Sequence, residues 1–367
     1  MDRRTALTAI GAAVLAGCLG RDGETPSPEG ASTTDTEPTA TAASGPPTAD
    51  ETLPLTMAPD AIRQSAVSGG PPKDGIPSID DPEFVAPDEG TSRLSPGDPV
   101  FGVAMGREVK AYPQAILAHH EICNDTVGGT PVSVTYCPLT GTAMGFHRGE
   151  TTFGVSGRLF NNNLIMYDRA TEAWWPQVLA TSVPGPWNAA PGQQSLRQFP
   201  VVWTTWERWR TTFPETTVLS RDTGYARNYD ADPYGSYNPR KGYYAPDSSP
   251  MFSALSSDDR LATKAVVIGA RTRDGAVAFA KARLREDRLI EGAIGETVVL
   301  AAYDPDLDTA WVYRNPEEQS FEYRDGEVVD GDGNAFDADS LPLEAIVAFD
   351  AMWFAWIGFY PETELHA

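Results

Sequence analysis

The sequence predicts an α+β fold that is rich in strands and forms one domain from two related halves. The first observation is an internal repeat, because residues 101–146 align without a gap onto residues 268–313 at a constant offset of 167. Eleven of the 46 aligned pairs are identical, more than average residue usage gives by chance. The second observation is that both halves contain short runs of apolar residues separated by glycine turns, a pattern typical of strands. Each half is therefore expected to form a hairpin, a short helix and further strands.

In the first half, each element follows from a local pattern. Residues 101–105 and 109–112 flank a Gly-Arg turn and predict the first hairpin. Residues 113–119 predict a short helix, because a proline is tolerated in the first helical turn. Three more strands, separated by glycine-containing turns, are expected at 121–125, 132–137 and 142–147.

The segment between the halves contains three further features. Strand-like runs occupy residues 152–156 and 164–167. Residues 206–213 predict a helix with its large aromatic side chains on one buried face. Residues 222–250 are rich in Gly, Pro, Tyr and Asp and predict a long irregular insertion that covers one face of the domain. Long ordered loops are also where functional sites tend to lie.

Residues 1–18 predict an export signal of the twin-arginine type. Arg3 and Arg4 precede an apolar stretch at residues 6–15, which is shorter than the roughly 20 residues that a membrane-spanning helix needs. The stretch ends in Leu-Ala-Gly-Cys, which resembles a lipobox and predicts lipid attachment at Cys18. The alternative is a weak signal peptide with an incidental cysteine.

Residues 19–57 predict a disordered tether, because they are rich in Thr, Pro, Ser, Ala, Gly and acidic residues and cannot bury a core. Residues 58–367 then form the single domain. We expect a protein anchored to the outer face of the cytoplasmic membrane, with the membrane as its partner through the lipid on Cys18.

The net charge of −23 argues against nucleic acid as a partner, because no basic stripe offsets the acidic residues. The acidic residues are spread along the chain and lysines are few. This distribution is typical of the surface of a halophilic protein, so we interpret the charge as a solvation feature.

Several motifs in a fixed order carry a family resemblance. They include His120-Glu-Ile-Cys-Asn-Asp, Val134-Thr-Tyr-Cys-Pro-Leu-Thr-Gly, Asn163-Leu-Ile-Met-Tyr-Asp and Asp232-Pro-Tyr-Gly-Ser-Tyr. Together they resemble the domain-of-unknown-function family numbered 3179 (DUF3179), from about residue 60 to the C-terminus. The resemblance implies no particular activity. This chain has Thr140 where the family often has a second cysteine, which weakens a CxxC redox or zinc hypothesis.

The reactive side chains of the first half are missing from the second. His119, His120 and Cys137 align with Glu286, Asp287 and Asp304. If the strands around the Thr126–Thr130 turn pair in a register centred on Gly128, residue 119 lies opposite 137 and residue 120 opposite 136. Cross-strand neighbours lie about 4.5–5.5 Å apart at Cβ, so an imidazole would approach the Cys137 sulfur. The first half is therefore the candidate site.

Two hypotheses give Cys137 and a neighbouring histidine a chemical role. In the first, the cysteine, imidazole and thioether of Cys137, His120 and Met166 hold a soft, copper-type metal, with His119 and His147 as further ligands. In the second, Cys137 is a nucleophile that His120 activates, while Asp125 or Asn124 orients the imidazole. The second hypothesis predicts a thiol-dependent transferase or hydrolase.

The third hypothesis is structural. Cys137 is then buried, or it forms a disulfide with Cys123, as is usual in an oxidising compartment. The expected register opposes the disulfide, because residue 123 would face 133 instead of 137. The protein would in that case be a non-catalytic structural or interaction module of the cell surface.

Overall fold

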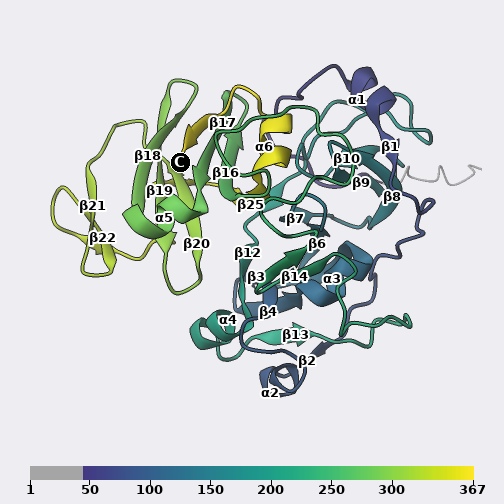
Figure 1. Cartoon of the computed structure of the whole chain (residues 1–367), viewed down its shortest axis with the longest axis horizontal. Coiled ribbons are helices and arrows are strands. Elements are labelled where there is room, and N and C mark those ends of the chain that lie inside the picture. Colours follow the sequence, from purple (N-terminus) through teal and green to yellow (C-terminus); the bar gives the residue numbers. More distant parts are fainter. Residues whose placement is uncertain (1–43) are drawn as a thin grey trace, which may run out of the picture. The chain divides into compact units, whose positions relative to one another are not determined.

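The computed structural model describes residues 44–367 (Figure 1), so the expected signal at 1–18, its Cys18 and most of the tether lie outside the described residues. About 40% of the described residues are in strands and about 12% are in helices, which confirms the strand-rich α+β class. The end of the expected tether contacts the domain, because the Leu53 amide donates to Ser195 Oγ at 2.8 Å and Leu53 is buried. The folded part therefore begins before residue 58.

Six elements make up what we call the first series, and the predicted order of hairpin, helix and strands matches them closely. They are β3 (Pro99–Met105), β4 (Glu108–Pro113), α3 (Gln114–His120), β5 (Ile122–Val127), β6 (Thr130–Cys137) and β7 (Thr142–His147). The β5–β6–β7 sheet is buried on both faces, so a separate cluster of apolar side chains packs on each side of it.

Six elements of the same kinds and order form the second series. They are β16 (Val266–Thr272), β17 (Gly275–Ala280), α5 (Lys281–Asp287), β18 (Leu289–Ile294), β19 (Thr297–Asp304) and β20 (Thr309–Arg314). Each bound is 167 higher than its counterpart in the first series. The strand registers also correspond, since Gly102 pairs with Ala111 and Gly269 pairs with Ala278.

A tryptophan packs on a strand glycine in each series. Trp209 lies against Gly102 and Trp356 lies against Gly269, so closely that a Cβ at either glycine would overlap the indole ring. The two tryptophans belong to short helices that follow strands paired with β3 and β16. These elements are α4 (Trp206–Thr212) after β12 (Val202–Thr205), and α6 (Trp353–Phe359) after β25 (Ala348–Met352).

The other described elements complete the sheets or connect them. On the N-terminal side of the insertion they are α1 (Pro59–Ser65), β1 (Val67–Ser68), β2 (Phe84–Val85), α2 (Pro87–Thr91), β8 (Phe153–Phe160), β9 (Asn163–Asp168), β10 (Trp174–Pro176), β11 (Gln198–Phe199) and β13 (Thr217–Leu219). From the insertion onward they are β14 (Gly235–Tyr237), β15 (Arg240–Gly242), β21 (Phe321–Arg324), β22 (Glu327–Asp330), β23 (Ala335–Phe336), β24 (Glu344–Ile346) and β26 (Glu364–His366).

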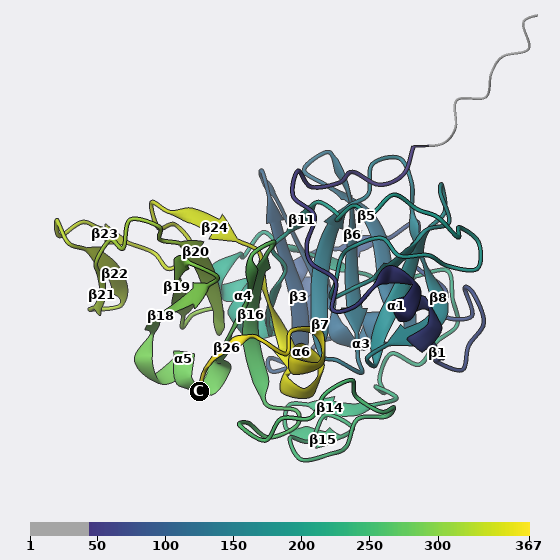
Figure 2. The same cartoon turned by 90° about the horizontal axis from the view of Figure 1, so that it is seen from above.

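The insertion at residues 222–250 lies beyond one end of the first series, on the side where α3 and α6 lie (Figure 2). Its only strands, β14 and β15, pair with each other and not with a larger sheet. Side chains therefore hold it in place.

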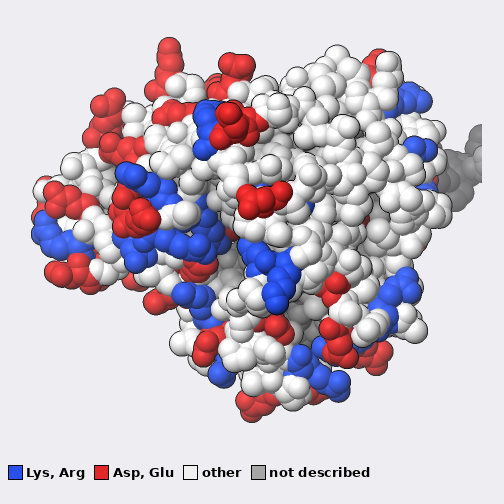
Figure 3. All heavy atoms as spheres, viewed as in Figure 1, with Lys and Arg blue, Asp and Glu red and all other residues white. Residues whose placement is uncertain are grey.

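Figure 3 shows acidic and basic side chains intermingled over the second series, so the acids form no single patch on that face.

Candidate functional site

Cys137 is the last residue of β6, where it pairs with Thr142 of β7. Its side chain is 1% exposed. The Sγ atom donates to Asn162 O at 3.6 Å and accepts the Leu164 N–H at 3.4 Å. Burial, followed by the charge of Glu121, raises the pKa of the thiol to about 11. The described structure therefore holds Cys137 as a neutral, covered thiol.

The predicted register of the β5–β6 hairpin is wrong by one residue. Cys123 pairs with Val134, instead of facing residue 133. The reason is the turn, in which Gly128 and Gly129 both have positive φ (56° and 75°) and together form a two-residue connection. The pairing is centred between the two glycines and not on the first. Cys123 and Cys137 consequently lie on opposite faces of the sheet, and both thiols are free.

His120 lies at the end of α3 and is fully buried. Its Nδ1 donates to Pro77 O at 2.8 Å, and its Nε2 is 2.6 Å from the Tyr229 hydroxyl. Burial lowers the pKa of the imidazole. Because both ring nitrogens are occupied by groups other than Cys137, the structure does not bring these two side chains together as an imidazole–thiol pair.

His119 and His120 both contact the insertion. His119 Nε2 lies 3.0 Å from Ala231 O, and the hydroxyl that bonds His120 belongs to Tyr229. Tyr229 also bonds Thr223 Oγ1 at 2.6 Å. The two histidines therefore fasten the insertion to α3.

Asp125 lies at the far end of β5 in a buried ion pair. Its carboxylate is 3.0 Å from Lys110 Nζ and accepts the Tyr112 hydroxyl at 2.6 Å. It also accepts the Thr126 amide at 2.7 Å. This carboxylate pairs with a lysine and orients no imidazole.

The remaining predicted ligands are dispersed. Met166, on β9, lies in the same apolar cluster as Cys137. The His147 ring packs edge-on against Phe199, and burial lowers its pKa. Within residues 44–367, no group of three or more His, Cys, Asp and Glu side chains is placed to hold a metal ion. A soft-metal centre therefore stays a prediction.

Glu121 is the residue that the sequence hypotheses missed. It follows α3 with a left-handed backbone (φ 60°), and its carbonyl accepts the Tyr136 amide at 2.7 Å. The side chain is 6% exposed, and no described residue gives its carboxyl a hydrogen bond or an ion pair. Burial raises its pKa to about 8. A carboxyl in this state exchanges its proton near neutral pH, and perturbed groups of this kind gather at functional sites.

A layer of tyrosines from the insertion covers Glu121 and Cys137. Burial and then the charges of these two residues raise the pKa of Tyr234. The Tyr243 hydroxyl donates to Leu139 O at 2.7 Å, just after Cys137 in the chain. A second hydrogen-bonded group anchors the layer and contains Gln114, Tyr136, Asp232 and Tyr244.

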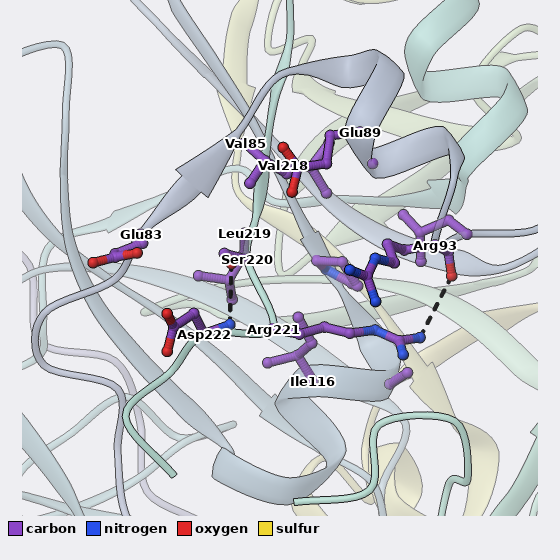
Figure 4. Close-up of a pocket in the computed structure, with 14 residues that line it drawn as sticks. Glu83, Val85, Glu89, Arg93, Ile116, Val218, Leu219, Ser220, Arg221 and Asp222 are labelled. Atoms are coloured by element: carbon purple, nitrogen blue, oxygen red, sulfur yellow. Dashed lines mark hydrogen bonds between the residues drawn. The ribbon is translucent and has the colours of Figure 1, made fainter. Parts of the chain in front are cut away.

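A cavity of about 360 Å³ lies elsewhere, between α2, α3 and β13 (Figure 4). Arg221 crosses it, pairing with Asp230 at 2.6 Å and donating to Arg93 O at 3.4 Å. Neither Cys137 nor Glu121 lines it. This cavity is therefore separate from Cys137 and Glu121.

Comparison with known protein families shows to which family the chain belongs. A family model described as protein of unknown function (DUF3179) matches residues 73–363. The chain belongs to this family. No curated protein and no solved structure matches the chain. In this DUF3179 protein, no described helix is both long and apolar enough to cross a membrane.

One sequence signal points to the missed residue of this DUF3179 domain. At the offset of 167, Glu121 corresponds to Arg288, which also has positive φ (69°) and also accepts an amide hydrogen from the next strand, that of Tyr303. The backbone is thus alike while the side-chain charge is reversed. Comparing every charged pair, and not only His and Cys, would have brought up Glu121 together with Arg107, which aligns with Asp274.

Proposed function

We propose that this protein is a thiol-dependent enzyme, a transferase or hydrolase, whose reaction centre is the pair Cys137 and Glu121. One observation carries the proposal: Glu121 is buried without a partner for its carboxyl, and its backbone is bonded to Tyr136, the residue before Cys137. The charge of Glu121 also contributes to the raised pKa of the Cys137 thiol. Burying an unpaired acid is unfavourable. An apolar side chain would fill a purely structural position better.

In the proposed reaction, the Cys137 sulfur attacks an acyl carbon of an ester-type substrate. The thiol proton passes to the Glu121 carboxylate, and Glu121 then returns it to the departing alcohol. Water or a second nucleophile releases the acyl group from sulfur. Glu121 therefore acts as the base, the role that the thiol hypothesis gave to His120. His120 instead bonds the insertion that covers the site.

The reaction requires the insertion to move, because Cys137 is 1% exposed beneath it. The insertion is held mainly by side-chain bonds, such as those of His119, His120 and Tyr243, and its strands do not pair with a larger sheet. Such contacts open more readily than an extended strand ladder. The insertion is thus the proposed lid.

We also propose that the two series are copies of one duplicated unit and that only the first retains the site. Support comes from the constant offset between their elements and from the matching tryptophan–glycine contacts. Lipid attachment at Cys18, export by a twin-arginine signal and a halophilic surface belong to the same proposal. They are supported by the N-terminal sequence and the net charge of −23.

A soft-metal centre is the alternative function. It is favoured by the common apolar cluster of Cys137 and Met166, a thiol and a thioether. In this alternative, His120 would have to release its bond to Tyr229 before binding a metal. Metal content after expression without chelator, in the unmodified chain and in Cys137→Ser, distinguishes this alternative from the enzyme.

The test of the enzyme uses the chain in a Cys18→Ser background and the activated ester p-nitrophenyl acetate. We expect an acetyl group on Cys137 and not on Cys123, and release of nitrophenol that Cys137→Ser abolishes. Glu121→Gln should slow acetylation about 100-fold, as for loss of a general base. Cys123→Ser is the matched control and should react normally. If acetylation is absent and no metal is bound, Cys137 is structural.

A further inference from the structure

A second cavity, of about 530 Å³, lies between the two series and has no assigned role. Its walls come from β12, from the β14–β15 part of the insertion, and from β16 and α5 of the second series. In Figure 3 the surface is hollowed between the regions of α5 and β14, and Lys and Arg side chains border the hollow. The volume suits a small organic ligand.

Two of the cations that line this cavity are already neutralised. Lys281 Nζ lies 2.7 Å from the Asp350 carboxylate, and both groups are buried. Arg285 forms a two-pronged ion pair with Asp308, at 2.8 and 2.7 Å. These pairs leave no net charge on the α5 wall.

Arg240 is the cation that lacks an anion. Its Nη2 donates to the carbonyl of Lys264 at 2.8 Å, and no described carboxylate forms an ion pair with it. Lys264, its buried neighbour, is bonded only to neutral oxygens of Tyr243 and Ser248. Burial, followed by the charge of Arg240, lowers the pKa of Lys264 to about 8. Arg240 therefore brings uncompensated positive charge to the insertion wall.

Three polar groups of the lining also lack partners. Thr204 Oγ1 on β12, the Tyr237 hydroxyl on β14 and Arg240 Nε are shielded from solvent and form no hydrogen bond within the described chain. A buried donor without an acceptor destabilises a fold by about 1–3 kcal/mol. An oxygen-rich anion accepts hydrogen bonds from donors of all three kinds.

Much of the remaining lining is apolar. Trp203 and Tyr237 meet edge to face with ring centroids 4.9 Å apart, and Leu261 and Met352 add aliphatic surface. Such a wall suits the flat or branched body of an organic acid. Inorganic anions would leave this surface unused.

We propose that this cavity binds a small organic acid, with its carboxylate at Arg240 and Thr204 and its apolar body against Trp203. The proposal does not depend on a reaction at Cys137. Either site can therefore fail without the other.

The test is a titration of 4-fluorobenzoate with the full chain, followed by ¹⁹F NMR line broadening. We expect saturable binding, weakened about tenfold in Arg240→Met, because a hydrogen-bonded charge is removed. The neutral probe 4-fluorobenzamide should also bind about tenfold more weakly. Arg324→Met, on the exposed β21 strand, is the matched control and should bind as the unmodified chain does.

Thr204→Val keeps the test decisive if Arg240→Met does not unfold cooperatively. This variant should raise the melting temperature without ligand, since a buried unpaired hydroxyl is removed, and should bind 4-fluorobenzoate about threefold more weakly. Unchanged binding in folded Thr204→Val, equal binding of benzoate and benzamide, or no saturable binding at all would overturn the proposal.

Discussion

The ends of the two series share a backbone but differ in burial and charge. In the first series, Glu121 and Cys137 are buried beneath the insertion. At the corresponding positions of the second series, Arg288 and Asp304 are partly exposed. Asp304 there accepts the amides of its own turn. The fold itself therefore does not require a thiol or a buried acid at these positions. The presence of Glu121 and Cys137 in the first series needs another explanation.

The largest expected effect on stability comes from replacing the two tryptophans, and it tests whether the two series depend equally on them. Trp209→Ala and Trp356→Ala should each lower the free energy of unfolding by about 3–5 kcal/mol, because each removes a fully buried indole from a strand glycine. Denaturant unfolding of both variants provides the measurement. A large loss in one variant beside no loss in the other would break the equivalence.

Glu121→Gln tests the buried acid through the pH dependence of stability. The folded-state pKa of about 8 lies above the ordinary 4.5, so the folded chain binds this proton more tightly than the unfolded chain. The unmodified protein should therefore lose up to about 5 kcal/mol of stability from this group as pH rises from about 4.5 to above 8.

The glutamine variant should lack that part of the pH dependence and be the more stable protein at pH 9. Arg288→Gln, the counterpart in the second series, serves as the control and should leave the pH profile unchanged. Parallel profiles for the unmodified chain and Glu121→Gln would show that Glu121 has an ordinary pKa.

Tyr229→Phe tests the fastening of the insertion. It removes the hydroxyl that bonds His120 and Thr223, which should lower stability by about 1–2 kcal/mol. Alkylation of Cys137 by iodoacetamide should become several-fold faster, as mass spectrometry would show. Tyr323→Phe on β21 is the control. Slower or unchanged alkylation would argue against the insertion as a lid.

Asp304→Asn should have the smallest effect. Asparagine retains the oxygen that accepts the amides of Asp306 and Leu307, so stability should change by less than about 1 kcal/mol. Acetylation of Cys137 should be unaffected. A marked fall in either quantity would mean that the second series contributes to the site.

The strands and short helices could be predicted from the sequence because their patterns are local. The helix expected at 113–119 is α3, and the strands expected at 132–137 and 142–147 correspond to β6 and β7. The register could not be predicted as reliably, since the choice between one and two glycines at the turn shifts every cross-strand pair. Because of this shift by one residue, Cys123 pairs with Val134 instead of residue 133.

The candidate site was predicted only in part. Cys137 follows from the alignment of the two halves, because its counterpart is an aspartate. The position of His120 depends on bonds to Pro77 and Tyr229, which are 43 and 109 residues away in the chain. Glu121 draws its properties from burial under the insertion, a tertiary effect that no local pattern reveals.

The most direct test of whether Glu121 accepts the proton of the Cys137 thiol is the pH–rate profile of Cys137 alkylation in a Cys18→Ser, Cys123→Ser chain. With Glu121 present, we predict a rise in rate centred near pH 8, where the carboxyl ionises and becomes able to accept the thiol proton. Glu121→Gln should lose this rise and react appreciably only well above pH 8, because burial, the larger cause, still raises the pKa of the Cys137 thiol. Identical profiles for the two chains would contradict the account.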